Sequence, residues 1–353
     1  MNNKSPKKYK ETTIHDIARA SEVSAATVSR VLSRSNYPVN PEVRTRVLQA
    51  AEKLNYKHSL IYRSSKIFDK EIAILISNFS NPFFPSIAVG FENVVSGEGF
   101  HSLVYDVNHW LSGSSPQMLL YSLLRKNVKG VLVASPVMYS VAEEFKDDFI
   151  SRNIKVVMAD CPKPNSIFNN VYYDYRKGSC LATEYLINKG HRNIVYAGLR
   201  LERESRELMV QGFLEAMLTH EITHKDQIII LDSQDQDENT QIESGEQLAY
   251  RIFNLKKRPS AVVVTNDIVA FGILRGFHKM NIKIPEDISV IGYDDSIFCE
   301  MSFPALTTVK VQSEQMGQMA AMLLLNDING ISQNPVGLSL EPCIVERDSV
   351  VQV

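Results

Sequence analysis

The stretch Val23–Leu32, which reads VSAATVSRVL, carries apolar residues at helical spacing. Val28, Val31 and Leu32 stand at positions i, i+3 and i+4 and therefore share one face of a helix. The opposite face carries small and polar side chains together with Arg30. Such a helix can pack on a small core by one face and fit a DNA major groove with the other. An ordinary three-helix bundle has the same pattern, so both interpretations stay open on this evidence.

Two more short helices are predicted on either side of this stretch. Thr13 is placed to cap the first helix and Ser24 to cap the middle one, because both residue types favour the N-cap position. Asn40 followed by Pro41 is typical of the start of a third helix. No strand pattern interrupts residues 13–56, so the sequence predicts an all-α head.

The charge of the chain is unevenly distributed. Residues 1–70 hold 14 Lys and Arg against 6 Asp and Glu, a net charge of +8, whereas the rest holds 24 against 34, a net charge of −10. This difference predicts that the head binds a polyanion and the body does not. The four cysteines are widely separated in the sequence, which is typical of reduced thiols in a cytoplasmic protein. No apolar run is long enough for a membrane span or a secretory signal.

From residue 71 onward, short apolar runs alternate with helical patterns. This alternation predicts mostly parallel sheets with helices on both faces, and the length is enough for two lobes. The predicted strands are Ile72–Ile76, Leu103–Tyr105, Gly130–Ala134, Lys155–Ala159, Ile194–Ala197, Ile228–Leu231, Ala261–Val264 and Ser289–Ile291.

Several motifs together point to one family. They are TIHDIA from Thr13, the stretch from Val23, RVL from Arg46, LNY from Leu54, SNPFF from Ser80, NKGHRNI from Asn188, TND from Thr265, IPEDISVIGYDD from Ile284 and LTTV from Leu306. With these motifs the chain closely resembles the lactose-repressor/galactose-repressor family of bacterial transcription regulators. The resemblance implies a helix-turn-helix head and an α/β periplasmic-binding-protein-like body of type I, whose two parallel-sheet lobes are joined by three crossings.

The resemblance also implies domain boundaries. We expect a DNA-binding domain over residues 1–57, a hinge over 58–70 and an effector-binding and dimerisation domain over 71–353. Within this body we expect one lobe from 71–172 plus 303–330 and a second from 173–302 plus 331–353.

The resemblance makes Ala25, Ala26 and Arg30 the expected base-reading residues, because an arginine fork can bridge guanine O6 and N7. Hydroxyl groups and helix N-terminal amides are suited to phosphate contacts. The expected DNA-binding residues are Thr13, Ser24, Ala25, Ala26, Thr27, Ser29, Arg30, Tyr56 and Arg63. The expected partner is a near-palindromic operator bound by a homodimer.

Polar and aromatic side chains follow several of the predicted strands. Phe83 and Phe84 follow the first strand after a short loop, whereas Asp160, Asn266 and Asp294 follow later strands. Residues beyond the carboxyl ends of parallel strands converge on a crevice. Carboxylates, amides and aromatic rings suit a sugar, although capping and core packing also explain each residue alone. These five residues are the predicted effector site.

Three departures from the family pattern stand out. Glu22 occupies the turn position where glycine is usual, and His58 and Ser65 replace the hinge proline and leucine. Met209 replaces an arginine that anchors the effector, and Arg203 and Arg206 are nearby but out of register.

The sequence favours a repressor of a carbohydrate-utilisation operon, gated by a sugar or sugar derivative. A family-like regulator that responds to a protein partner, such as a phosphocarrier protein, is the alternative. The stretch His220–His224 matches HExxH, but there is little room for it to be helical, so zinc is not expected. No catalytic constellation, cofactor or metal site is predicted, so we expect a cytoplasmic regulator and not an enzyme.

Overall fold

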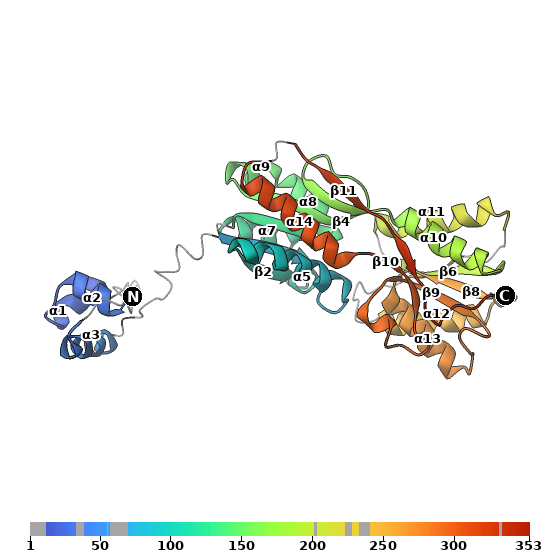
Figure 1. Cartoon of the computed structure of the whole chain (residues 1–353), viewed down its shortest axis with the longest axis horizontal. Coiled ribbons are helices and arrows are strands. Elements are labelled where there is room, and N and C mark those ends of the chain that lie inside the picture. The colour runs from blue at the N-terminus through green and yellow to red at the C-terminus, as the bar shows by residue number, and fades with distance from the viewer. Residues whose placement is uncertain are drawn as a thin grey trace, which may run out of the picture. The chain divides into compact units, whose positions relative to one another are not determined.

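A computed structural model describes residues 12–32, 39–54, 56, 70–126, 128–200, 203–222, 228–232, 241–331 and 334–353. The chain divides into two compact units, residues 1–68 and 69–353. The first is helical and the second contains two β-sheets with surrounding helices (Figure 1). The predicted hinge residues 58–69, which include His58, Arg63 and Ser65, lie outside the described part of the chain.

The helical unit contains α1 (Ile14–Ala20), α2 (Ala25–Leu32) and α3 (Pro41–Lys53). Its core is formed by one face of each helix, with Ile17, Val28 and Val47 fully buried. The first two predicted caps are present: the Thr13 hydroxyl accepts from the backbone N–H of Asp16, and the Ser24 hydroxyl from that of Thr27. The Asn40 side chain accepts from the backbone N–H of Glu42 at the start of α3. The prediction of an all-α head is therefore confirmed.

The first sheet of the body has six strands in the order β11-β5-β4-β3-β1-β2, all paired in parallel. Their bounds are β1 (Glu71–Ile76), β2 (His101–Asp106), β3 (Gly130–Ala134), β4 (Lys155–Cys161), β5 (Asn169–Tyr173) and β11 (Gly337–Leu340).

The second sheet also has six strands, in the order β12-β10-β9-β8-β6-β7, and only β10 and β12 pair antiparallel. Their bounds are β6 (Ile194–Arg200), β7 (Ile228–Asp232), β8 (Ala261–Val264), β9 (Ser289–Asp294), β10 (Thr307–Lys310) and β12 (Cys343–Val345).

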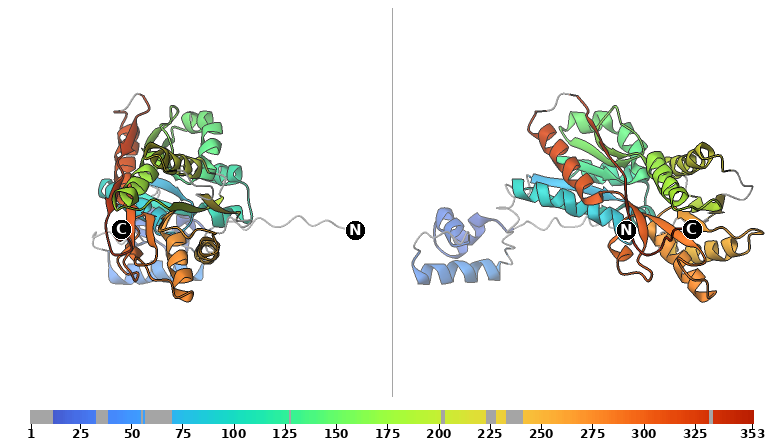
Figure 2. Two further views of the ribbon diagram at one scale, coloured as in Figure 1. Left: turned by 90° about the vertical axis from the view of Figure 1, so that its right-hand side faces the viewer. Right: turned by 45° about the vertical axis from the view of Figure 1, so that its right-hand side comes forward.

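Helices cover both faces of each sheet, as Figure 2 shows from two further directions. On the first sheet, one face packs against α5 (Phe83–Val95) and α14 (Ser313–Ile328). The other face packs against α7 (Pro116–Leu124), α8 (Tyr139–Glu144) and α9 (Lys146–Ser151), and α6 (Val107–Leu111) follows β2. Short 3-10 turns are η2 (Ser96–Glu98), η3 (Pro136–Met138) and η5 (Ile297–Cys299).

On the second sheet, α10 (Tyr175–Asn188) and α11 (Glu204–Thr219) cover one face. The helices α12 (Gln241–Phe253) and α13 (Asp267–Lys279) cover the other. One apolar core runs continuously from the α5–α14 face of the first sheet to the α10–α11 face of the second. The predicted two-lobed parallel α/β body is confirmed, and the core explains why its lobes form one compact unit.

The chain passes between the sheets three times, after β5, after β10 and after β11. These passages correct the predicted lobe boundaries in two places: β10, within the segment assigned to the first lobe, belongs to the second sheet, and β11 belongs to the first sheet. Neither strand was predicted, and β5 and β12 were also missed. Their short lengths and polar residues give no periodic signal, and tertiary hydrogen bonds hold them in place.

Candidate DNA-reading and effector-binding sites

The exposed face of α2 carries the residues predicted to read bases. Ala26, Ser29 and Arg30 are exposed and Ala25 is half-buried, whereas Val28 and Val31 are buried against the head core. The face is therefore narrow at its N-terminal end, and it places a guanidinium one turn further along. This shape matches what entry into a major groove requires.

The predicted phosphate-contacting hydroxyls take part in capping. Thr13 Oγ1 donates to Asp16 Oδ2 at 2.7 Å while Asp16 Oδ2 also accepts from the Thr13 backbone N–H. The Ser24 and Thr27 hydroxyls form a hydrogen bond of 2.8 Å with each other. These bonds hold the beginnings of α1 and α2 rigid, so their N-terminal amides are preorganised for an anion. Ser29 lies beyond them on the exposed face of α2.

Tyr56 is half-buried and packs on the core of the head. It closes the bundle after α3, where the Thr12 hydroxyl also donates to the carbonyl of Leu54 at 2.9 Å. The tyrosine thus has a packing role in the head, whereas its contact with DNA stays a prediction. Arg63, the remaining predicted DNA contact, lies outside the described residues.

The strand registers bring the predicted effector residues to corresponding edges of the two sheets. In the first sheet β1 and β3 end together, since Ile76 pairs with Ala134, and Asp160 lies at the end of β4 in a bulge. In the second sheet Asp294 ends β9 and Asn266 follows β8. All these residues lie at carboxyl-terminal strand ends, the edge where ligands of parallel α/β proteins bind.

Asp160 is buried and accepts a hydrogen bond from the hydroxyl of Tyr175, the first residue of α10. The Tyr175 ring stacks on Tyr293 of the second sheet, with ring centroids 6.1 Å apart. Tyr173 of the first sheet packs edge-on against both rings. A tyrosine cluster therefore joins strand ends of both lobes beside Asp160. Sequence reasoning did not identify these tyrosines, because only the fold brings them together.

Asn266 is fully engaged at the start of α13. Its Oδ1 accepts from the Val269 backbone N–H at 2.9 Å, and its Nδ2 donates to Gln241 at 2.9 Å. Phe83 and Phe84 form an edge-to-face pair in the first turn of α5 and are buried in the core. The structure thus gives these three residues the capping and packing roles that were also considered from sequence.

Arg206, in the first turn of α11, reaches the same edge of the second sheet. Its Nη1 donates to the carbonyl oxygen of Thr265, just after β8, at 3.0 Å and lies 3.3 Å from the Met209 sulfur. Its Nε is buried without a hydrogen-bond partner among the described residues, and so is Nδ2 of Asn78, which follows β1. Near its carboxyl-terminal edge, each sheet therefore has a buried N–H donor that no described residue accepts from.

Asp267 is a fully buried carboxylate in the second sheet's core. It accepts from the Ser296 backbone N–H and the Thr308 hydroxyl, both at 2.7 Å, and from the Cys299 thiol at 3.1 Å. Burial raises its pKa to about 6, and these hydrogen bonds oppose the rise. Its partners belong to the β9–η5 loop, to η5 and to β10, so it fixes the backbone just after Asp294.

Comparison with known proteins identifies the chain. A model of bacterial regulatory proteins of the lacI family matches residues 13–59, and one of a periplasmic binding protein-like domain matches residues 183–350. The HTH-type transcriptional repressor PurR of Proteus mirabilis is 31% identical over 345 residues, which cover 96% of both chains. The chain belongs to the lacI family of bacterial regulatory proteins.

Solved structures show the same architecture. A LacI family transcriptional regulator from Enterococcus faecium, with bound ribose, has a TM-score of 0.70 and 26% identity over 80% of this chain and 100% of its own. The lac repressor dimer bound to operator has a TM-score of 0.69 and 22% identity over 97% of this chain and 100% of its own, a likeness of fold. This lacI-family protein is thus a DNA-binding transcriptional repressor and not an enzyme, as the sequence predicted.

Two of the repressor's departures from the family pattern now have structural detail. Glu22 adopts a left-handed conformation with φ of 54°, the kind of position where glycine is favoured. Met209 is fully buried, and the Arg206 guanidinium rests against its sulfur. The repressor therefore has an arginine near the expected place, but it comes from one turn earlier on α11.

The first two residues of the HExxH stretch, His220 and Glu221, lie beyond the end of a helix. α11 ends at Thr219, His220 is its C-cap and Glu221 has φ of 56°. The expectation that this stretch has little room to be helical holds for His220 and Glu221, and His224 lies outside the described residues. Among the described residues, no group of three metal-ligating side chains occurs, and no helix is long and apolar enough to cross a membrane.

Proposed function

We propose that this repressor is gated by a small-molecule effector, a sugar or sugar derivative, bound at the carboxyl-terminal edges of the two sheets. The observation that carries the proposal is the pair of buried donors, Asn78 Nδ2 and Arg206 Nε, which have no partner among the described residues. Buried donors in proteins are almost always paired. Unpaired donors at strand ends are typical of a site that a ligand completes.

Carboxylates at the same carboxyl-terminal strand ends support a polyhydroxylated effector. Asp160 and Asp294 offer oxygen acceptors for hydroxyl groups, one from each sheet. The ribose-bound regulator from Enterococcus faecium and a CelR–cellobiose complex share the fold. For Phe83, Phe84 and Asn266, contact with the effector stays a prediction, since packing and capping already account for them. The regulated genes would accordingly serve carbohydrate utilisation.

For the head, we propose that α2 enters the operator major groove. Ala25 and Ala26 allow close approach, and Arg30 binds a base edge or a neighbouring phosphate. The capped starts of α1 and α2 bind the DNA backbone. The proposed phosphate and backbone contacts are Thr13, Ser24, Thr27, Ser29, Tyr56 and Arg63.

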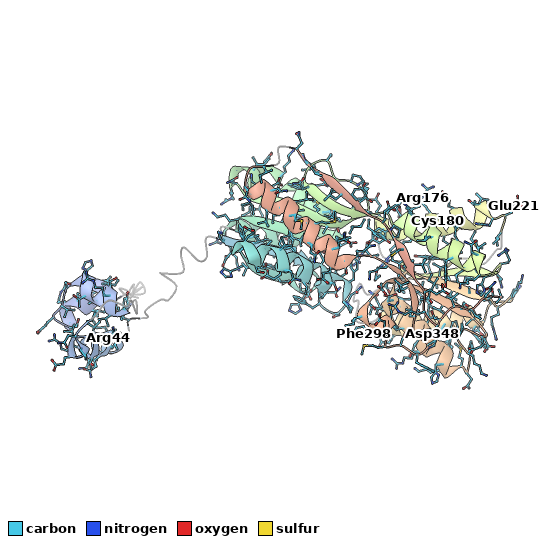
Figure 3. All side chains as sticks on the ribbon, viewed as in Figure 1. Arg44, Arg176, Cys180, Glu221, Phe298 and Asp348 are labelled. Carbon is cyan, nitrogen blue, oxygen red and sulfur yellow. The ribbon has the colours of Figure 1, made fainter. Side chains whose placement is uncertain are left out.

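We also propose a homodimer in the cytoplasm, which binds a near-palindromic operator. An apolar surface around η5 supports it: Ile297 is 71% exposed, Met301 75%, and Phe303 fully. Phe298, labelled in Figure 3, is 46% exposed and packs edge-on against Phe271. Exposed apolar patches of this kind mark protein interfaces, and the lac repressor of similar fold is a dimer on its operator.

The alternative is a regulator that responds to a protein partner. The absence of the usual arginine at position 209 favours it, because that arginine anchors a small-molecule effector in the family. Arg206 reaches the edge of the second sheet where that arginine was expected to act. The reason for preferring a protein signal over a small molecule is therefore weaker than the sequence suggested.

The DNA-reading proposal is tested with Arg30→Ala. After an operator is selected from random-sequence DNA, binding of the full chain to operator and to unrelated DNA is measured at one salt concentration. We expect Arg30→Ala to lose about 1–3 kcal/mol of operator binding and therefore to discriminate less between operator and unrelated DNA. Arg44→Ala, which removes the same charge from α3, is the matched control and should keep discrimination. Undiminished discrimination in Arg30→Ala would remove α2 from base reading.

The effector proposal is tested with Asp294→Asn, which keeps the side-chain shape at a residue with φ of 116°. The variant should bind operator normally and lose the response to any small molecule that alters operator binding by the wild type. An intact response in Asp294→Asn would place the effector elsewhere.

A further inference from the structure

Arg206 is a partly buried cation that has no counter-ion among the described residues. In the described part of the chain, no carboxylate oxygen lies within 4.0 Å of its guanidinium, which donates hydrogen bonds to the Thr265 carbonyl and the Met209 sulfur. Two other arginines of the body have carboxylate partners: Arg176 pairs with Glu215 at 2.7 Å and Arg347 with Asp295 at 2.7 Å. A guanidinium removed from water without an anion is costly, so its retention needs a compensating partner.

The positive charge of Arg206 acts on residues of the proposed effector site. Burial raises the pKa values of Tyr175 and Tyr196, and the positive charge of Arg206 partly offsets both rises. Tyr175 donates to Asp160 and stacks on Tyr293, so the charge acts where strand ends of both lobes meet.

Helix geometry explains how Arg206 takes this place. Residues 206 and 209 are three positions apart on α11 and therefore lie on the same face. Met209, buried at the position of the usual arginine, supplies a soft acceptor that supports one nitrogen of the guanidinium. The carbonyl of Thr265 binds the same nitrogen, Nη1, and the buried Nε–H has no acceptor in the described part of the chain.

We propose that the effector carries an anionic group, a carboxylate or a phosphate, and that Arg206 binds it at the edge of the second sheet. The proposal rests on the proposed effector function and narrows its ligand class to polyhydroxylated anions. Hydroxyl groups of such a ligand bind Asp160 and Asp294, whereas its anion forms a charge-assisted hydrogen bond with the guanidinium. The second lobe thus distinguishes an acidic or phosphorylated sugar from the neutral sugar.

The first test uses inorganic phosphate on the full chain. We expect a higher melting temperature in phosphate than in chloride at equal pH and ionic strength, because an anion that binds the folded state stabilises it by mass action. Arg206→Met should lose this difference and Arg206→Lys should keep part of it. Arg176→Met, which removes an exposed guanidinium from α10 (Figure 3), should keep all of it. An equal phosphate effect in wild type and Arg206→Met overturns the proposal.

The second test distinguishes the two anions and uses calorimetric titration with D-gluconate, D-glucuronate, D-glucose 6-phosphate and neutral D-glucose. We expect at least one anionic probe to bind more tightly than D-glucose, and Arg206→Met to weaken that binding about 10- to 100-fold. A panel in which D-glucose binds as well as every anion overturns the proposal. A neutral sugar that releases or enforces operator binding independently of Arg206 would refute the proposal of an anionic effector. It would leave intact the proposal that a small molecule gates the repressor. If no small molecule alters operator binding, effector gating itself fails.

Discussion

Replacing Glu22 with glycine should stabilise the head. Glu22 is exposed, lies in the turn between α1 and α2 and has φ of 54°. At such an angle an L side chain clashes with its own backbone, which glycine avoids because it has no Cβ. Relief of this strain outweighs the greater freedom of glycine in the unfolded chain, so we expect a net gain of about 1 kcal/mol.

The gain can be measured by hydrogen exchange in the full chain. An increase of about 1 kcal/mol should slow exchange of the most protected head amides about fivefold. Buried residues of the three helices, Ile17, Val28 and Val47, supply suitable amides. Amides of the body should be unaffected.

A matched control separates the turn geometry from the loss of a glutamate. Glu42→Gly removes an exposed carboxylate from the first turn of α3, where glycine lowers helix propensity by about 1 kcal/mol. This variant should exchange faster in the head. If Glu22→Gly also exchanges faster, or at the wild-type rate, the left-handed turn does not strain the head and the reasoning is refuted.

Three further predictions concern the body. Gly178→Ala should lower the free energy of unfolding by about 1–3 kcal/mol in denaturant titrations, because the new Cβ would lie 2.0 Å from the buried Tyr293 hydroxyl; an unchanged midpoint would contradict this. Tyr175→Phe should cost about 1.5–3 kcal/mol in the same assay, because it removes the donor to Asp160; no loss would mean the bond is not stabilising. Asp267, whose pKa rises to about 6, holds its proton more tightly in the folded state, so its contribution to stability is full below pH 4 and is lost as the pH rises through 6. Asp267→Asn should remove this loss of up to about 3 kcal/mol from the pH profile, and a profile identical to wild type would exclude Asp267 as its source.

The head could be predicted from sequence almost completely. Its helices depend on local signals: the Thr13 and Ser24 caps, the Asn40–Pro41 start and the apolar stripe through Val28. These signals act over three or four residues, so neighbours in sequence already contain the physical cause. Even the strained turn at Glu22 was evident as a departure from the family pattern.

The body's strands could be predicted where they are continuously apolar. β3 (Gly130–Ala134) and β8 (Ala261–Val264) have the predicted bounds, because buried parallel strands need apolar side chains on both faces. β5 was missed because it starts with two asparagines. Asn169 fits in a buried strand only since Asp327 and the backbone N–H of Val336 bind its amide, and both are distant in sequence.

The sequence by itself therefore determined the family, the helical head, the alternating strands and the acidic residues at strand ends. Only the tertiary structure decided which strands β10 and β11 pair with, and which donors are left unpartnered among the described residues. Arg206 is out of register in the sequence, yet it binds the Thr265 carbonyl because α11 covers the face of the sheet that β6 and β8 share. Such contacts depend on distance in space, and neither periodicity nor motif spacing records that distance.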